Sequence, residues 1–197
     1  VNHYEGNYTA ENMIVSVVGG VDNILPKIEK SFSTLKSSKP KIESFSYEFN
    51  GKQETFVEKK KTLSAYMILG YKIPPRLHKD TYVLDVVASI LGRGQSGKIF
   101  DEIRNKRGLS YEVGVNCEST SDHGFFSVHA SINKEKIKLA TDLILKEIKK
   151  INEVSTEDIS DAKGFIEGNY ILEAEDSFKL ADHLCFWESL KDAKLSE

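Results

Sequence analysis

The stretch from Gly92 to Tyr111 constrains the fold more than any other part of this chain. It starts as a glycine-rich turn and continues into a short amphipathic run that predicts a helix. Ile99, Phe100 and Ile103 share one face of that helix and are expected to pack inward. Gly108 is expected to end the helix, because glycine adopts the left-handed conformation without steric cost. A strand pattern follows at once, so the stretch predicts a tight corner between a helix and a strand.

The rest of the chain alternates between short strands and amphipathic helices. Apolar runs predict strands at Met13–Val18, Gln53–Lys60 and Leu63–Ile73, and a hairpin of Tyr111–Ser119 with Gly124–Ile132. Helical spacing predicts helices capped by Asp22, Asp80 and Asn133, a helix that starts with a capping-box pattern at Ser155–Asp158, and a last helix from roughly Asp176. The polar segment 36–51 is typical of a surface loop. Together these elements predict an α+β fold of two layers, a largely antiparallel sheet with helices packed on one face.

Composition excludes several classes of protein. A length of 197 residues suits one domain, and 40% hydrophobic with 29% charged residues is typical of a folded globular protein. The formal net charge of −3 argues against nucleic-acid binding, and no apolar run is long enough to span a membrane. We therefore expect no nucleic-acid or membrane partner, and a cytoplasmic location. Because the sequence starts at Val1 and enters a strand almost immediately, we expect a piece of a longer protein.

Three runs of sequence carry a resemblance to a known family. Ile90–Gly92 and Ser96–Tyr111 resemble the signature of the carboxy-terminal domain of the insulinase-like zinc peptidases, and Tyr8–Asp22 is similar to the strand that opens that domain. This family, peptidase M16, includes insulin-degrading enzyme and the mitochondrial processing peptidase. The resemblance implies a LuxS/MPP-like metallohydrolase fold. It also implies that residues 1–197 form a single carboxy-terminal-type domain, a fragment of a longer two-domain chain.

The metal site of the family is absent from this sequence. In such peptidases zinc is held by an H-x-x-E-H helix and a further downstream Glu. None of the five histidines lies in that motif or in an i, i+4 pair, so no residue here is assigned to metal: His3, His78, His123, His129 and His183. The resemblance implies that zinc belongs to the other, amino-terminal domain of the parent enzyme, and that the isolated segment binds no cofactor.

Arg104 and Tyr111 are the candidate site residues. From the residues alone, Arg104 is better explained as a solvated helix charge and Tyr111 as a half-buried strand aromatic. The resemblance implies more, because an Arg and a Tyr seven residues apart in this half of the family face the zinc site, bind the substrate backbone and stabilise the developing oxyanion. Both residues match that pair in type and spacing. Arg107 is the nearby competitor, but its spacing does not fit.

Two other kinds of chemistry are disfavoured. Gly92–Lys98 imitates a phosphate-binding loop, but Ile99 stands where a Ser or Thr must hold magnesium, and the loop follows a helix instead of a strand. A turn between two helices explains it better. Cys185 lies on an apolar helix face and Cys117 in a predicted strand, so both are expected to be structural thiols and not nucleophiles.

The resemblance implies a substrate-binding, chamber-closing domain of a zinc-dependent metalloendopeptidase that cleaves peptides. Its expected partners are an amino-terminal zinc-bearing domain or subunit of similar fold and a peptide substrate, with a homo- or heterodimer as a further expectation. The isolated segment is expected to be inactive. One alternative is a non-catalytic scaffold, as the core proteins of the respiratory bc1 complex resemble this family. Another is a stand-alone partner that completes the active site of a separate zinc-bearing subunit.

Overall fold

The computed structural model describes residues 2–39 and 51–196, which fall into two compact units. The first unit combines Val1–Phe45 with Tyr170–Glu197, and the second comprises Ser46–Asn169. The first contains α1 (Asn2–Asn7), η1 (Ala10–Asn12), α2 (Leu25–Phe32), α7 (Ser177–Leu190) and η6 (Ala193–Ser196). The second contains β1 (Ala65–Ile73), α3 (Thr81–Gly92), η2 (Gly94–Ser96), α4 (Lys98–Phe100), η3 (Asp101–Asn105), β2 (Val113–Ser119), β3 (Gly124–Ile132), η4 (Lys134–Lys136), α5 (Ile137–Lys149) and η5 (Lys150–Glu153). Helix α6 (Thr156–Ala174) begins in the second unit and ends in the first.

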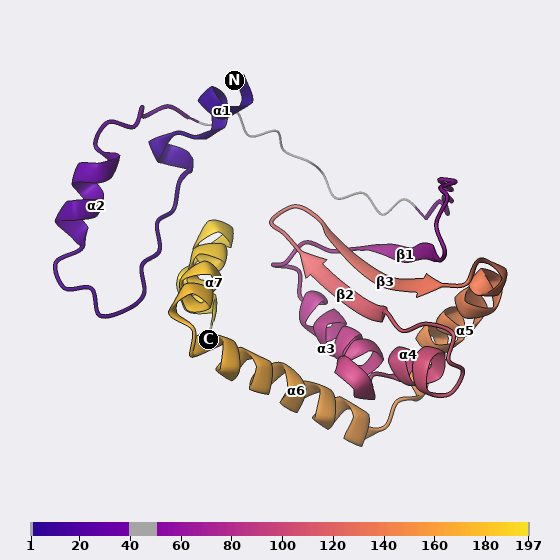
Figure 1. Cartoon of the computed structure of the whole chain (residues 1–197). Coiled ribbons are helices and arrows are strands. Elements are labelled where there is room, and N and C mark those ends of the chain that lie inside the picture. The colour runs from indigo at the N-terminus through magenta and orange to yellow at the C-terminus, as the bar shows by residue number, and fades with distance from the viewer. Residues whose placement is uncertain (1, 40–50, 197) are drawn as a thin grey trace. The chain divides into compact units, whose positions relative to one another are not determined.

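A three-stranded antiparallel sheet in the order β1-β3-β2 organises the second unit. β3 lies in the centre, with Ala65 opposite Ile132 on one side and Val113 opposite Ala130 on the other. Helices α3, α4 and α5 lie on the same face of this sheet (Figure 1). On the opposite face, Tyr66 of β1 is 75% exposed. The predicted α+β fold, its antiparallel pairing and its hairpin are therefore confirmed.

The core lies between the sheet and these helices. Alternate residues of β3 face the helices, and the helices contribute apolar residues spaced three and four apart. The buried cluster consists of Ile73, Leu91, Ile99, Ile103, Phe126, Val128, Ala130, Ile132, Ala140 and Ile144. Ile99 and Ile103 belong to this cluster, so the short helix that carries Arg104 is anchored by its inner face, as its sequence predicts.

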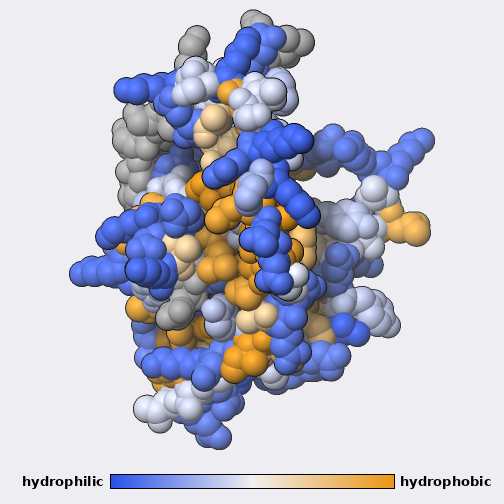
Figure 2. Space-filling view, turned by 90° about the vertical axis from the view of Figure 1, so that its left-hand side faces the viewer, coloured by the Kyte–Doolittle hydropathy of each residue, from blue (hydrophilic) through white to orange (hydrophobic). Residues whose placement is uncertain are grey.

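The first unit is more sparsely packed. Helix α2 buries none of its residues, whereas α7 buries Trp187, whose indole N–H donates to Nε2 of His183 at 3.1 Å. Apolar side chains of the segment before α2 are exposed, among them Val15 at 46%. Hydrophobic residues also reach the surface in Figure 2. Within residues 2–39 and 51–196, no helix is both long enough and apolar enough to cross a membrane.

Several local predictions are wrong. Met13–Val18 and Gln53–Lys60 form no strand. An apolar run specifies burial, but a strand also needs a neighbour to pair with, and the structure gives neither segment one. Asp80 precedes α3 but makes no side-chain cap. Instead, the buried Thr81 hydroxyl lies within hydrogen-bonding distance of the carbonyls of Arg76 and His78, at 2.8 and 2.7 Å. Residues 40–50 of the predicted surface loop lie outside the described residues.

Candidate functional site

The segment that carries Arg104 is a π-helix and not an α-helix. In η3 the N–H of Lys106 donates to the carbonyl of Asp101, five residues back, at 2.9 Å. Such turns are rare in proteins and occur frequently at functional sites. The wider turn changes the directions of the side chains that follow Ile103, which is itself fully buried. The sequence predicts a helix here, but periodicity over so few residues does not distinguish the two helical forms.

Gly108 ends this helix in the way its sequence predicts. Its φ is +58°, and its N–H donates to the carbonyl of Arg104 at 2.9 Å. The N–H of Leu109 then reaches back six residues to the carbonyl of Ile103 at 2.9 Å. These bonds resemble a Schellman cap in which each ring is one residue wider, as expected after a π-turn. The last carbonyls of the helix are therefore satisfied, and the chain turns sharply toward β2.

Arg104 and Tyr111 lie together at this corner. Nη1 of Arg104 donates to the backbone carbonyl of Tyr111 at 3.1 Å. The guanidinium carbon also lies 5.0 Å from the ring centre of Phe100 and 5.7 Å from that of Tyr111, both within cation–π range. The guanidinium thus lies close to two aromatic rings while it binds a peptide carbonyl. The sequence argument placed Phe100 in the core, but its side chain is only partly buried and contacts Arg104 instead.

The neighbouring cations are neutralised, whereas Arg104 is not. Lys106 Nζ lies 2.8 Å from Asp101, and Arg107 Nε donates to Glu102 at 2.8 Å. The hydrogen bond from Lys106 holds the pKa of Asp101 below its usual range, and the bond from Arg107 does the same for Glu102. Across the described residues, Arg104 has no carboxylate partner. Arg107, the competing candidate, is therefore engaged in an ion pair, and Arg104 keeps donors for a ligand.

Tyr111 does not occupy the strand position that its sequence context suggests. β2 begins at Val113, and the Tyr111 side chain is 89% exposed, so it is not a half-buried strand aromatic. The buried hydroxyl of Ser110 lies within hydrogen-bonding distance of the carbonyls of Glu112 and Ser131, at 2.6 and 2.7 Å. These contacts fix the backbone on each side of Tyr111. The phenol itself projects into solvent, where it is available as a hydrogen-bond donor.

The glycine-rich turn packs closely against β2 and against the end of α3. A Cβ at Gly92 would lie 2.4 Å from Cβ of Val115, and one at Gly97 would lie 2.7 Å from the carbonyl of Leu91. Only glycine allows these close approaches. The turn therefore seats β2 directly against the end of α3.

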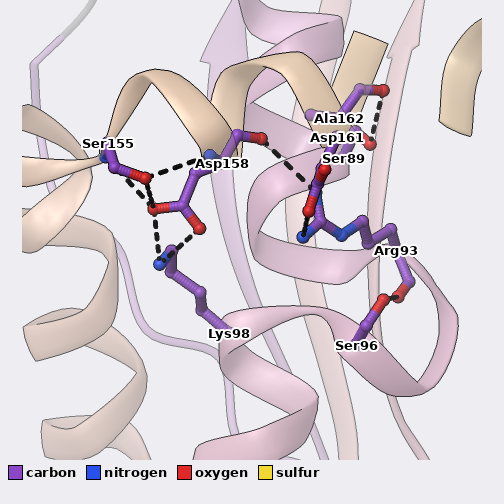
Figure 3. A network of polar contacts seen from close by, with 8 residues as sticks. All are labelled: Ser89, Arg93, Ser96, Lys98, Ser155, Asp158, Asp161 and Ala162. Carbon is purple, nitrogen blue, oxygen red and sulfur yellow. Dashed lines mark hydrogen bonds and ion pairs between the residues drawn. The ribbon is translucent and has the colours of Figure 1, made fainter. Parts of the chain in front are cut away.

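Two cations of the same turn bind the start of α6 (Figure 3). Lys98 Nζ lies 2.9 Å from Asp158, which also accepts from the N–H and hydroxyl of Ser155. Ser155 and Asp158 form the predicted capping box, since the Asp158 N–H donates back to the Ser155 hydroxyl at 3.1 Å. Arg93 donates to Asp161 and to the carbonyl of Asp158. Lys98 thus has a carboxylate partner, which supports the interpretation of this turn as structural.

The described residues hold no metal cluster beside this corner. No group of three His, Cys, Asp or Glu side chains able to hold a metal occurs among residues 2–39 and 51–196. Burial and the nearby carboxylate of Asp85 raise the pKa of Cys117 to about 11, so its thiol is protonated at neutral pH. The described part of the chain does not fit a zinc ion.

Comparison with known proteins identifies the family. A family model described as the peptidase M16 inactive domain matches residues 1–164. The chain belongs to this family. It is 32% identical over 173 residues to an uncharacterized zinc protease of Rickettsia felis, covering 86% of this chain and 41% of that protein. A second uncharacterized zinc protease, from Rickettsia bellii, is 31% identical over 167 residues. The chain therefore spans less than half the length of the curated relatives it matches.

Solved structures share the fold. A protease from Helicobacter pylori superimposes with a TM-score of 0.75 at 23% identity, over 90% of this chain and 45% of that one. A chain of complex III from Candida albicans superimposes with a TM-score of 0.73 at 18% identity, over 88% of this chain and 43% of that one. At these identities the likeness establishes the fold alone. One of these structures is described as a protease and the other as part of complex III, so the fold does not by itself decide the function.

Proposed function

We propose that this domain binds the backbone of a peptide substrate through Arg104 and Tyr111, within a longer zinc-dependent metalloendopeptidase. One observation carries the proposal: the Arg104 guanidinium binds a peptide carbonyl, that of Tyr111, and has no carboxylate partner among the described residues. The neighbouring Lys106 and Arg107 are both paired with carboxylates. Arg104 is therefore suited to a ligand that presents carbonyl oxygens.

The chemistry of the pair suits peptide hydrolysis. A guanidinium has five N–H donors, of which Arg104 uses one for Tyr111. Donors that are already oriented stabilise a carbonyl oxygen more strongly as negative charge develops on it. The rings of Phe100 and Tyr111 restrict the guanidinium, so little reorientation is needed when substrate binds. The exposed Tyr111 phenol adds a neutral donor on the same corner.

Zinc belongs to another part of the longer protein in this proposal. The described residues offer no metal site, whereas the curated relatives are named zinc proteases and are more than twice as long as the matched region. An amino-terminal domain or subunit of similar fold, bearing H-x-x-E-H, would hold the zinc, whose chemistry is the activation of a water molecule. Residues 1–197 would form the one domain that closes the chamber and binds the peptide. Alone, they are expected to hydrolyse nothing.

A binding measurement tests the role of Arg104. The 197-residue chain is titrated against a fluorescent, unstructured peptide, with Arg104→Ala and Arg107→Ala as matched variants that each remove one guanidinium from the same turn. A hydrogen bond to a charged group contributes about 1.5–3 kcal/mol, so Arg104→Ala should weaken binding about tenfold or more. Arg107→Ala should leave it nearly unchanged. Equal losses, or a loss only in Arg107→Ala, would reject the assignment. Zinc-dependent cleavage by the pure 197-residue chain would reject the assignment of the zinc site to another part of the longer protein.

A scaffold role is the second candidate. It is favoured by the likeness to a chain of complex III from Candida albicans. The two roles differ in the longer protein: a peptidase requires H-x-x-E-H in a domain of the same polypeptide or in a partner subunit, whereas a scaffold does not. Sequencing the gene around this segment therefore separates them. The cytoplasmic location and the homo- or heterodimeric state stay predictions, to be measured by cell fractionation and by sedimentation.

A further inference from the structure

The hydrogen-bond register of β2 determines which of its backbone groups point away from the sheet. The N–H of Ser131 donates to the carbonyl of Glu112, and the N–H of Thr120 donates to the carbonyl of His123. Both pairs belong to the register that joins β2 to β3. Hydrogen-bonded pairs alternate along an antiparallel ladder, so the even-numbered residues between 112 and 120 bond to β3. The odd-numbered residues direct their N–H and C=O groups outward.

The outward groups of β2 form an unpaired edge. Among the described residues, nothing is hydrogen-bonded to the main chain of Val113, Val115 or Cys117 on that side. These residues span about 14 Å at the usual rise of an antiparallel strand. Arg104 binds the carbonyl of Tyr111, which lies two residues before Val113. The Arg104 guanidinium therefore lies next to the start of the unpaired N–H and C=O groups along β2.

We propose that an extended peptide binds along this edge as a fourth strand, paired to Val113, Val115 and Cys117, with a carbonyl near its end bound by Arg104. The inference rests on the proposed function and specifies the conformation in which the substrate is held. Strand addition uses main-chain hydrogen bonds, which are common to all sequences, so it suits a domain that accepts varied peptides. The unused donors of Arg104 and the Tyr111 phenol add contacts for carbonyl oxygens at one end of the edge.

A peptide fits this edge better than a second copy of the chain does. In a symmetric antiparallel pairing centred on Val115, Val113 would face Cys117 of the other copy. The same register would place Glu118 opposite Glu112 twice, and like charges directly opposite each other destabilise a sheet. A peptide without acidic residues meets no such repulsion. The other edge of the sheet, along β1, also has outward groups, but no unpaired guanidinium lies beside it among the described residues.

Residue-resolved amide exchange tests the inference. The 197-residue chain is measured by NMR with and without a synthetic peptide of about ten residues, rich in Val, Gln and Lys, long enough to cover the edge. The bound peptide should slow exchange at Val113, Val115 and Cys117 by about tenfold or more at saturation, because those N–H groups gain acceptors. The amides of Gly114 and Asn116 already bond to β3 and should change little. The outward amide of Ile68, on β1, serves as an internal control and should not change.

A second probe changes the peptide and needs no variant of the protein. The same peptide with every backbone nitrogen methylated cannot pair as a strand, and it should bind at least about tenfold more weakly. If the peptide slows amide exchange only at Arg104 and Tyr111 and both peptides bind equally well, the peptide does not bind as a fourth strand. The proposed function would then still stand. No binding of either peptide would overturn both. Alternating protection that grows with protein concentration in the absence of peptide would assign the edge to a second copy instead.

Discussion

Two glycines with left-handed backbones allow the corner at Arg104 to be perturbed with a matched control. Gly108 has φ +58° and Gly94 has φ +44°, and a Cβ at either position would meet no atom within 4 Å. Substitution by Ala therefore strains the backbone at both sites without a steric clash. Only Gly108 lies between Arg104 and Tyr111, whereas Gly94 belongs to the glycine-rich turn.

The expected loss of stability follows from the backbone alone. A left-handed conformation costs an L-residue about 1–2 kcal/mol. Replacing glycine also reduces the entropy of the unfolded chain, which offsets about 0.4–1 kcal/mol. We therefore expect Gly108→Ala and Gly94→Ala each to lower the free energy of unfolding by about 1 kcal/mol. A Gly108→Asn variant should lose less, because asparagine tolerates this conformation better than alanine does.

Peptide affinity separates the two variants. Gly108→Ala relaxes its strain by shifting the residues beside it, which moves the Tyr111 carbonyl away from the guanidinium of Arg104. We expect it to weaken peptide binding severalfold, and Gly94→Ala to bind like the unmodified chain. Urea unfolding and fluorescence anisotropy measure the two quantities. If Gly108→Ala costs no stability, the left-handed cap is wrong. If both variants bind the peptide equally well, the backbone at Gly108 does not position Arg104 and Tyr111 for peptide binding.

Three further predictions concern the support of the site. Gly92→Ala places a Cβ 2.4 Å from Cβ of Val115 and should lower the unfolding free energy by about 1–3 kcal/mol, read from urea unfolding. The pKa of Asp158 is lowered, chiefly by Lys98, so its contribution is present above the unfolded pKa of about 3.9 and is lost as the pH falls through the folded pKa. Asp158→Asn should remove the charge that pairs with Lys98, lower the unfolding free energy by up to about 1 kcal/mol at pH 7, and flatten the acid limb of a stability profile. With a pKa of about 11, Cys117 should be alkylated at pH 8 about two hundredfold more slowly than an ordinary thiol, when measured in a Cys185→Ser chain.

Each of these has a clear contrary result. Unchanged stability of Gly92→Ala would mean that β2 does not pack against the glycine-rich turn as described. Identical acid limbs for the Asp158→Asn chain and the unmodified chain would deny the carboxylate its role at the start of α6. Rapid alkylation of Cys117 would show that its strand opens readily and that burial does not protect the thiol.

Local sequence patterns predicted the features that depend on neighbouring residues. The hairpin, the capping box of Ser155 and Asp158, and the glycine cap at Gly108 all depend on contacts within a few residues, and all are confirmed. The strands at Met13–Val18 and Gln53–Lys60 are wrong because pairing depends on a distant partner that composition does not specify.

The residues of the proposed site came from the family resemblance and not from the residues alone. The resemblance selected Arg104 and Tyr111 by type and spacing. The structure places the two residues together, and their role stays a prediction. The π-turn and the stacking of Phe100 on Arg104 could not be derived, because both depend on how the helix widens. The four-residue spacing of Phe100 and Arg104 was a usable signal, since such pairs share a helix face. Spacing alone favoured Arg104 over Arg107 as the candidate arginine. The hydrogen bond between Arg107 and Glu102 adds a structural reason for that preference.

Turnover by the longer protein tests the central claim most directly. We would express the complete gene product with zinc and compare peptide hydrolysis by the unmodified enzyme, Arg104→Ala, Tyr111→Phe and Arg107→Ala. If Arg104 stabilises the oxyanion, its removal should lower kcat by about 10²–10³, Tyr111→Phe should lower it less, and Arg107→Ala should match the unmodified enzyme. Hydrolysis that is as fast in Arg104→Ala as in Arg107→Ala would contradict the account.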